Sequence, residues 1–88
     1  MSKVTENGIK KFLEQTKSPM IEELFCKACE INTENDFNNY ERRLEMLRLN
    51  HDDDYHWYNI GYVALYGIDG LDEEDKEYFR CLVKEDNV

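Results

Sequence analysis

The feature that most constrains this chain is a stretch of twelve residues, Tyr55 to Tyr66, that carries no fixed charge. Charged residues make up 35% of the 88-residue sequence, yet the only titratable cation in this stretch is His56. On a helical wheel, Trp57, Ile60 and Ala64 lie together on one side, which is typical of a core-facing surface. A helix with so little charge exposes little of its perimeter to water. The stretch therefore predicts a central helix that ends at Gly67.

Four further segments have the period of an α-helix, and their ends carry capping signals. They cover residues 5–16, residues 18–31, a segment that follows Thr33 and a segment that starts near Asp72. Ser18 is a capping hydroxyl followed by a proline at the first helical position, and Thr33 with Asp36 forms an acidic variant of the capping box. Connections of two to six residues favour antiparallel neighbours. The sequence thus predicts an all-α fold, a compact bundle of four to five short antiparallel helices in a single domain, 1–88.

The net charge of −9 comes almost entirely from the second half of the chain. Residues 1–49 contain eight basic and nine acidic residues, a balance of −1, whereas residues 50–88 contain three basic and eleven acidic residues, a balance of −8. Such a field repels phosphates and anionic membranes and speeds the approach of basic surfaces. We therefore expect a basic protein partner, with no direct nucleic acid binding and no membrane.

The same half of the chain also carries a stripe of tyrosines. At helical spacing, four rings share one side of the central helix, and tyrosines are enriched at binding hot spots. Acidic residues come before and after this helix in the sequence, and carboxylates beside aromatic anchors suit a Lys- and Arg-rich partner. The predicted partner-binding residues are Tyr55, Tyr58, Tyr62 and Tyr66, with Asp52, Asp53, Asp54, Asp69, Glu73 and Glu74 as the charged rim.

Motifs for chemistry are weak throughout the sequence. Cys26 and Cys29 form a CxxC, but the two thiols point about 60° apart around a helix, and the spacing to His51 and His56 matches no zinc finger. No calcium loop, phosphate loop or nucleophile motif is present. We therefore expect no enzyme, no metal and no cofactor. An odd number of cysteines and the lack of an export signal point to free thiols and a cytoplasmic location.

These features favour an inhibitor that blocks a basic functional groove, because nucleases and other nucleic-acid enzymes hold phosphates with basic residues. In general character the chain resembles the small acidic helical immunity proteins of bacterial toxin systems, which also combine tyrosines with an acidic helix. The resemblance implies an immunity or antitoxin protein that neutralises a nuclease toxin. Two alternatives remain: a phage-type counter-defence inhibitor, such as an anti-CRISPR or nucleic-acid mimic, and a homodimeric structural or regulatory module. The chain is accordingly expected as a monomer or homodimer.

Overall fold

A computed structural model describes residues 3–83 of the chain, apart from the side chains of His51 and Asp52. Within this part there are five α-helices and two short 3-10 helices, and there is no strand. In chain order they are α1 (Glu6–Thr16), α2 (Glu22–Cys29), α3 (Glu34–Leu47), α4 (His51–Tyr66), η1 (Ile68–Gly70), α5 (Glu73–Phe79) and η2 (Arg80–Leu82). The predicted all-α fold is confirmed.

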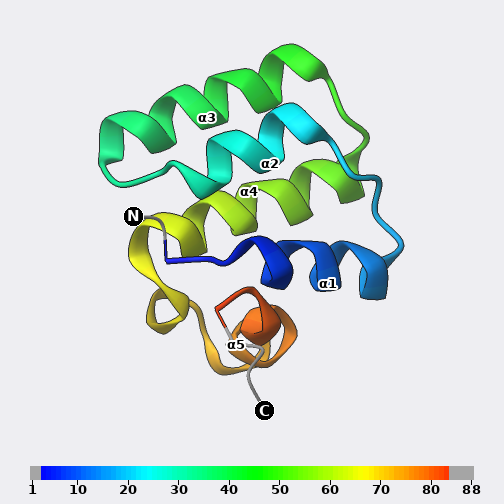
Figure 1. The fold of residues 1–88 in the computed structure, drawn as a ribbon, viewed down its shortest axis with the longest axis vertical. Coiled ribbons are helices and arrows are strands. Elements are labelled where there is room, and N and C mark those ends of the chain that lie inside the picture. The colour runs from blue at the N-terminus through cyan, green and yellow to red at the C-terminus, as the bar shows by residue number, and fades with distance from the viewer. Residues whose placement is uncertain (1–2, 84–88) are drawn as a thin grey trace.

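Helix α4, which contains the uncharged stretch of residues 55–66, lies at the centre of the molecule. In Figure 1 it runs between α2 and α3 on one side and α1 on the other, and successive helices from α1 to α4 reverse direction. α5 is seen nearly end-on below α1. Trp57, Ile60 and Val63 of α4 are all 0% exposed, so the helix occupies the position that the uncharged stretch of residues 55–66 predicts.

The buried hydrophobic side chains form one cluster, to which every α-helix contributes. Representatives are Ile9 of α1, Leu24 of α2, Leu44 of α3, Ile60 of α4 and Phe79 of α5. Their burial removes apolar surface from water, which is the main force that holds short helices together. Among residues 3–83, no helix combines the length and the apolar content that crossing a bilayer requires.

The contact between α3 and α4 depends on a tyrosine that packs against a glycine. The ring of Tyr40 is 1% exposed and fills the space in which a β-carbon on Gly61 would stand. Its hydroxyl donates a hydrogen bond to the backbone carbonyl of Trp57, one turn earlier in α4. Burial raises the pKa of Tyr40 well above its usual value, so the hydroxyl stays protonated and keeps donating. Gly61 therefore permits the close approach of the two helices.

A second glycine permits the contact between α1 and the C-terminal end of the described chain. A β-carbon on Gly8 would stand 2.6 Å from the backbone carbonyl oxygen of Cys81 in η2. The Thr5 amide donates to the carbonyl of Leu82 at 3.1 Å, and α1 makes its most extensive contacts with η2. Gly8 weakens α1 as an isolated helix, but it lets the η2 backbone lie directly against α1.

Two helix starts differ from the prediction. α4 begins at His51, four residues before Tyr55, because the side chain of Asn50 accepts from the Asp53 amide and caps the helix there. The aspartates that follow Asn50 thus lie inside the first turn, where the helix dipole favours negative charge. α2 begins at Glu22 and not at Pro19, because the hydroxyl of Ser18 contacts other side chains and caps no helix.

The predicted capping box of α3 is present. The Thr33 hydroxyl accepts from the Asp36 amide at 3.2 Å, and the Asp36 carboxylate accepts from the amides of Asn32 and Thr33 at 3.0 and 3.1 Å. These backbone hydrogen bonds hold the pKa of Asp36 below its usual value. The ionised carboxylate therefore stabilises the start of α3.

Replacing Gly61 by alanine should destabilise the protein. The new methyl group has to displace the buried Tyr40 ring, and overpacking of this kind costs about 1 to 3 kcal/mol. Urea unfolding of the Gly61→Ala variant measures the loss. In a Tyr40→Leu background, whose smaller side chain frees this space, the extra cost of Gly61→Ala should shrink, and an undiminished cost would contradict the proposed contact.

The stabilising effect of Asp36 should depend on pH in one direction. Because folding lowers its pKa, the contribution is complete above the unfolded value of about 4 and is lost as the pH falls through the folded value. The free energy of unfolding of Asp36→Asn should therefore lie below that of the parent at pH 7 and approach it near pH 2. If the difference in free energy of unfolding between the parent and Asp36→Asn stays constant from pH 7 to pH 2, the charge of Asp36 is not involved.

Candidate protein-binding surface

Four tyrosines of α4 lie on the side of the helix that faces away from the core. Tyr55 is 44% exposed, Tyr58 39% and Tyr66 44%, whereas Tyr62 is half-buried. The rings of Tyr62 and Tyr66 are 4.8 Å apart between centroids, and Tyr58 packs edge-on against Phe37 of α3 at 5.6 Å. The row is thus supported from beneath by aromatic contacts and keeps ring surface open to solvent, as binding anchors do.

Each exposed ring of the row lies beside a carboxylate. The Tyr55 hydroxyl donates to Asp75 of α5 at 3.4 Å, and the Tyr66 hydroxyl donates to Glu34 of α3 at 3.3 Å. Desolvation, followed by the charge of the neighbouring acid, raises the pKa of Tyr55 and Tyr66. The same two causes raise the pKa of Tyr58, where the neighbouring acid is Glu41. All three phenols therefore stay neutral and act as donors at physiological pH.

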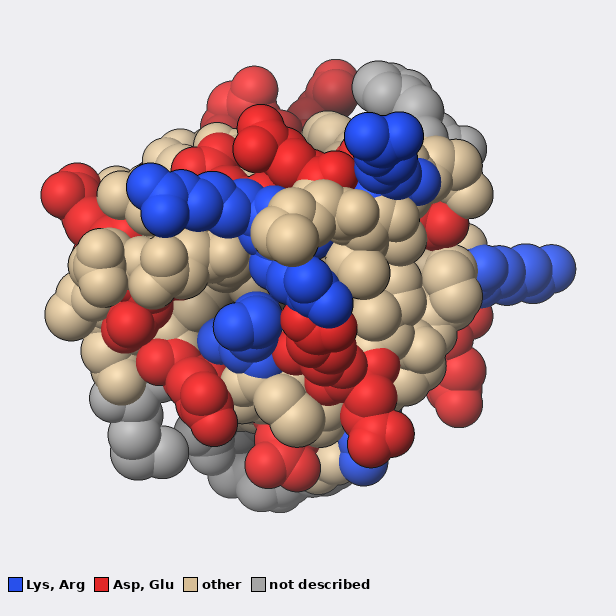
Figure 2. Space-filling view, turned by 90° about the horizontal axis from the view of Figure 1, so that it is seen from above, with Lys and Arg blue, Asp and Glu red and all other residues tan. Residues whose placement is uncertain are grey.

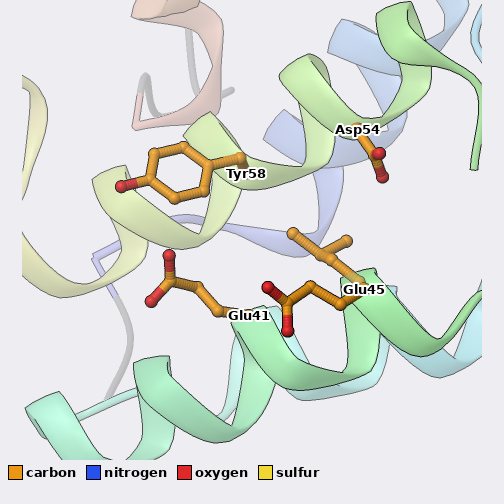
Figure 3. A pocket seen from close by; sticks show the side chains of 5 residues that line it. Glu41, Glu45, Asp54 and Tyr58 are labelled. Atoms are coloured by element: carbon orange, nitrogen blue, oxygen red, sulfur yellow. The ribbon is translucent and has the colours of Figure 1, made fainter. Parts of the chain in front are cut away.

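A groove between α3 and α4 brings further acids to this row. It has a volume of about 230 Å³ and is lined by Glu41, Leu44, Glu45, Asp54 and Tyr58. Figure 3 shows the two glutamates rising from α3 toward α4, Asp54 pointing from the first turns of α4 toward α3, and the Tyr58 ring at the other end. We call the exposed side of α4 together with this groove the tyrosine–acid face; its residues are Tyr55, Tyr58, Tyr62, Tyr66, Glu34, Glu41, Glu45, Asp54 and Asp75.

The predicted acidic rim is divided by the fold. Asp54 belongs to the groove beside Tyr58, and Asp53 lines a polar cleft beside Tyr55. Asp69 is exposed in η1, and Glu73 and Glu74 are exposed in the first turn of α5, where Glu73 pairs with Lys76 at 3.6 Å. The side chain of Asp52 lies outside the described residues.

Sequence reasoning missed four acids of this face. Glu34, Glu41 and Glu45 come from α3, in the half of the chain with little net charge, and Asp75 rather than Glu73 or Glu74 reaches Tyr55. A signal for two of them, Glu41 and Glu45, was present in the sequence. Phe37, Tyr40 and Leu44 form the buried stripe of α3, and the residue after Tyr40 or Leu44 flanks that stripe on the side next to α4.

A different face of the molecule carries charges of both signs. Viewed from above, on the α3 side, Lys and Arg side chains gather at the centre with acidic side chains among and around them (Figure 2). One ion pair joins Arg43 of α3 to Glu23 of α2, and it lowers the pKa of the Glu23 carboxyl. This mixed face is a poorer match for a basic partner than the tyrosine–acid face, because its own cations repel such a partner.

A hydrogen-bonded chain of side chains lies in the polar cleft beside Tyr55, which Thr16, Ser18, His56 and Tyr78 also line. The Thr16 hydroxyl donates to the Phe12 carbonyl at 2.9 Å, and Ser18 Oγ lies 2.9 Å from Thr16 Oγ1. Ser18 Oγ is also 2.8 Å from His56 Nδ1, and His56 Nε2 is 3.2 Å from the Tyr78 hydroxyl. The chain links the end of α1, the α1–α2 connection, α4 and α5.

The direction of the hydrogen bonds in this network of side chains determines the role of His56. Because Thr16 gives its proton to a carbonyl, all the bonds form together only when Ser18 donates to Thr16 and His56 donates from Nδ1 to Ser18. In the neutral imidazole, Nε2 of His56 then accepts a hydrogen bond from the Tyr78 hydroxyl. A catalytic base would instead take the proton of Ser18. The arrangement therefore favours a structural link over a nucleophile with its base.

The cysteines and acids of the described chain form no metal site. Cys26 is exposed, and burial raises the pKa of both Cys29 and Cys81, which favours the unreactive thiol. Among residues 3–83, no three His, Cys, Asp or Glu side chains are placed to hold a metal ion. His51 was considered in the sequence as a possible zinc ligand together with the CxxC motif, but its side chain lies outside the described residues.

Comparisons with known proteins supply no further assignment. No protein-family model matches the chain, and no curated protein or solved structure matches it significantly.

Ser18→Ala should destabilise the fold by about 1 kcal/mol, because it leaves Thr16 Oγ1 and His56 Nδ1 without their shared partner. Urea unfolding at pH 7 measures the effect. Gln15→Ala, which alters an exposed residue one turn away, is the control and should change the free energy of unfolding by less than about 0.5 kcal/mol. Equal behaviour of the two variants would contradict the structural link.

Proposed function

We propose that this chain is a binding protein whose tyrosine–acid face docks onto a basic surface of another protein. The observation that carries the proposal is that each exposed ring of this row lies beside a carboxylate: Tyr55 and Tyr66 donate to Asp75 and Glu34, and Tyr58 lines the same groove as Glu41. Tyrosine rings supply contact area at low entropic cost, and carboxylates supply attraction to Lys and Arg.

The basic partner that fits this face best is an enzyme that holds nucleic acid. Such an enzyme presents Lys and Arg in a groove for phosphates, and a folded acidic domain can occupy that groove in place of the natural ligand. The proposed activity is therefore inhibition by competition, as in an immunity protein that neutralises a nuclease toxin or in a phage inhibitor that mimics nucleic acid. Both variants of the proposal use the same face and differ in the identity of the partner.

A crosslinking experiment in the native host tests the choice of face. A photoreactive phenylalanine analogue at position 58 should capture one partner, and the same analogue at position 46, which is 69% exposed on α3, should not. The captured protein should bind nucleic acid by itself, and the purified chain should displace a labelled oligonucleotide from it. Equal capture from both positions, or a partner without affinity for nucleic acid, would overturn the proposal.

The same assay gives a quantitative prediction for the Tyr58 anchor. Loss of one hot-spot ring costs about 2 kcal/mol, so Tyr58→Ala should raise the concentration needed for displacement by about 30-fold. Met46→Ala is the control, because Met46 is 69% exposed on α3 and is not one of the residues that line the groove. Similar losses in both variants would show that the face has been assigned wrongly.

A further inference from the structure

The groove between α3 and α4 contains an acceptor that the described protein leaves unused. Asp54 Oδ1 is buried and has no hydrogen-bond partner among the residues that the structure describes. A buried carboxylate oxygen without a partner is costly, so such an atom calls for an explanation. Figure 3 shows this carboxylate directed toward α3, on the side where Glu45 rises.

The other walls of the groove define what could use this acceptor. Glu41 and Glu45 add two more carboxylates, and among residues 3–83 no Lys or Arg side chain lines the groove. Its floor includes the buried side chain of Leu44, and the ring of Tyr58 forms one wall. The site is thus negative at its rim, apolar beneath and aromatic on one side.

This combination matches a large flat cation better than a metal ion. The three carboxylates form no metal-holding group, so they do not converge on one small ion. A guanidinium group presents five N–H donors across a plane, and it can reach separated carboxylates while it stacks on a tyrosine ring. The methylene stem of an arginine would cover Leu44, as long basic side chains cover apolar surface elsewhere.

We propose that the groove is a receptor for one arginine side chain of the partner protein, with Asp54 Oδ1 as its buried acceptor. The inference rests on the proposed function, since it names the partner's anchor on the tyrosine–acid face. Glu41 and Glu45 pair with the remaining N–H groups, and Tyr58 stacks against the guanidinium plane. An ammonium group lacks this planar fork, so the groove prefers arginine to lysine.

The test uses the whole chain and small probes of defined chemistry. Nα-acetyl-arginine N-methylamide is titrated into the labelled protein at low salt, and binding is followed by the NMR shifts of backbone amides. Shifts should concentrate at Leu44, Glu45, Asp54 and Tyr58. The citrulline analogue, which keeps the shape and removes the charge, should produce none, and the lysine analogue should bind several-fold more weakly.

Two variants locate the contact on the groove acids. Asp54→Asn should weaken arginine binding about tenfold, as expected for loss of one charge-assisted hydrogen bond. Glu45→Gln, an exposed position at the groove rim, provides a second reading that does not disturb a buried atom. Glu14→Gln removes the same charge from the exposed surface of α1 and should leave binding unchanged. Equal binding of the arginine and citrulline probes, or no effect of either groove variant, would overturn the proposal.

The outcome is separable from that of the proposed function. If position 58 captures a basic partner but the arginine probe does not bind, the face is correct and the arginine receptor is wrong. If the probe binds at the groove but position 58 captures no nucleic-acid enzyme, the receptor stands and the assignment of the partner fails.

Discussion

The arrangement of this molecule depends on the close approach of α3 and α4 at Tyr40 and Gly61. The buried ring lies where any other residue at position 61 would place a β-carbon, and its hydroxyl reaches the backbone of the facing helix. This contact sets how near the outer edge of α3 comes to the outer edge of α4. The glutamates of α3 consequently flank the tyrosines of α4, and the groove with Asp54 forms between them.

The sequence was sufficient for the parts of the fold that depend on local pattern. The lack of charge in residues 55–66 predicted the central position of α4, and Thr33 with Asp36 predicted the capping box at the start of α3. Both signals act within one helix, so no knowledge of the neighbours is needed to read them. The exposure of Tyr55, Tyr58 and Tyr66 also follows from the helical spacing of the tyrosines in residues 55–66.

What could not be predicted depends on contacts between distant segments. Ser18 is a residue type that often caps helices. Its hydroxyl instead bonds to His56, which lies 38 residues away in the sequence, and α2 starts later, at Glu22. The acids of the candidate site were sought near α4 in the sequence, whereas Glu41 and Glu45 reach it through the packing of α3. A charge balance summed over half a chain does not reveal which helices become neighbours.

The seating of η2 on Gly8 has a consequence for how the protein is made. Thr5 and Leu82, whose backbones are hydrogen-bonded, are separated by nearly the whole described sequence. During synthesis α1 leaves the ribosome first, and its most extensive contact, the one with η2, can form only after residues 81 and 82 have been made. The bundle is therefore complete only after synthesis has passed η2, and until then the surface of α1 that η2 covers stays exposed.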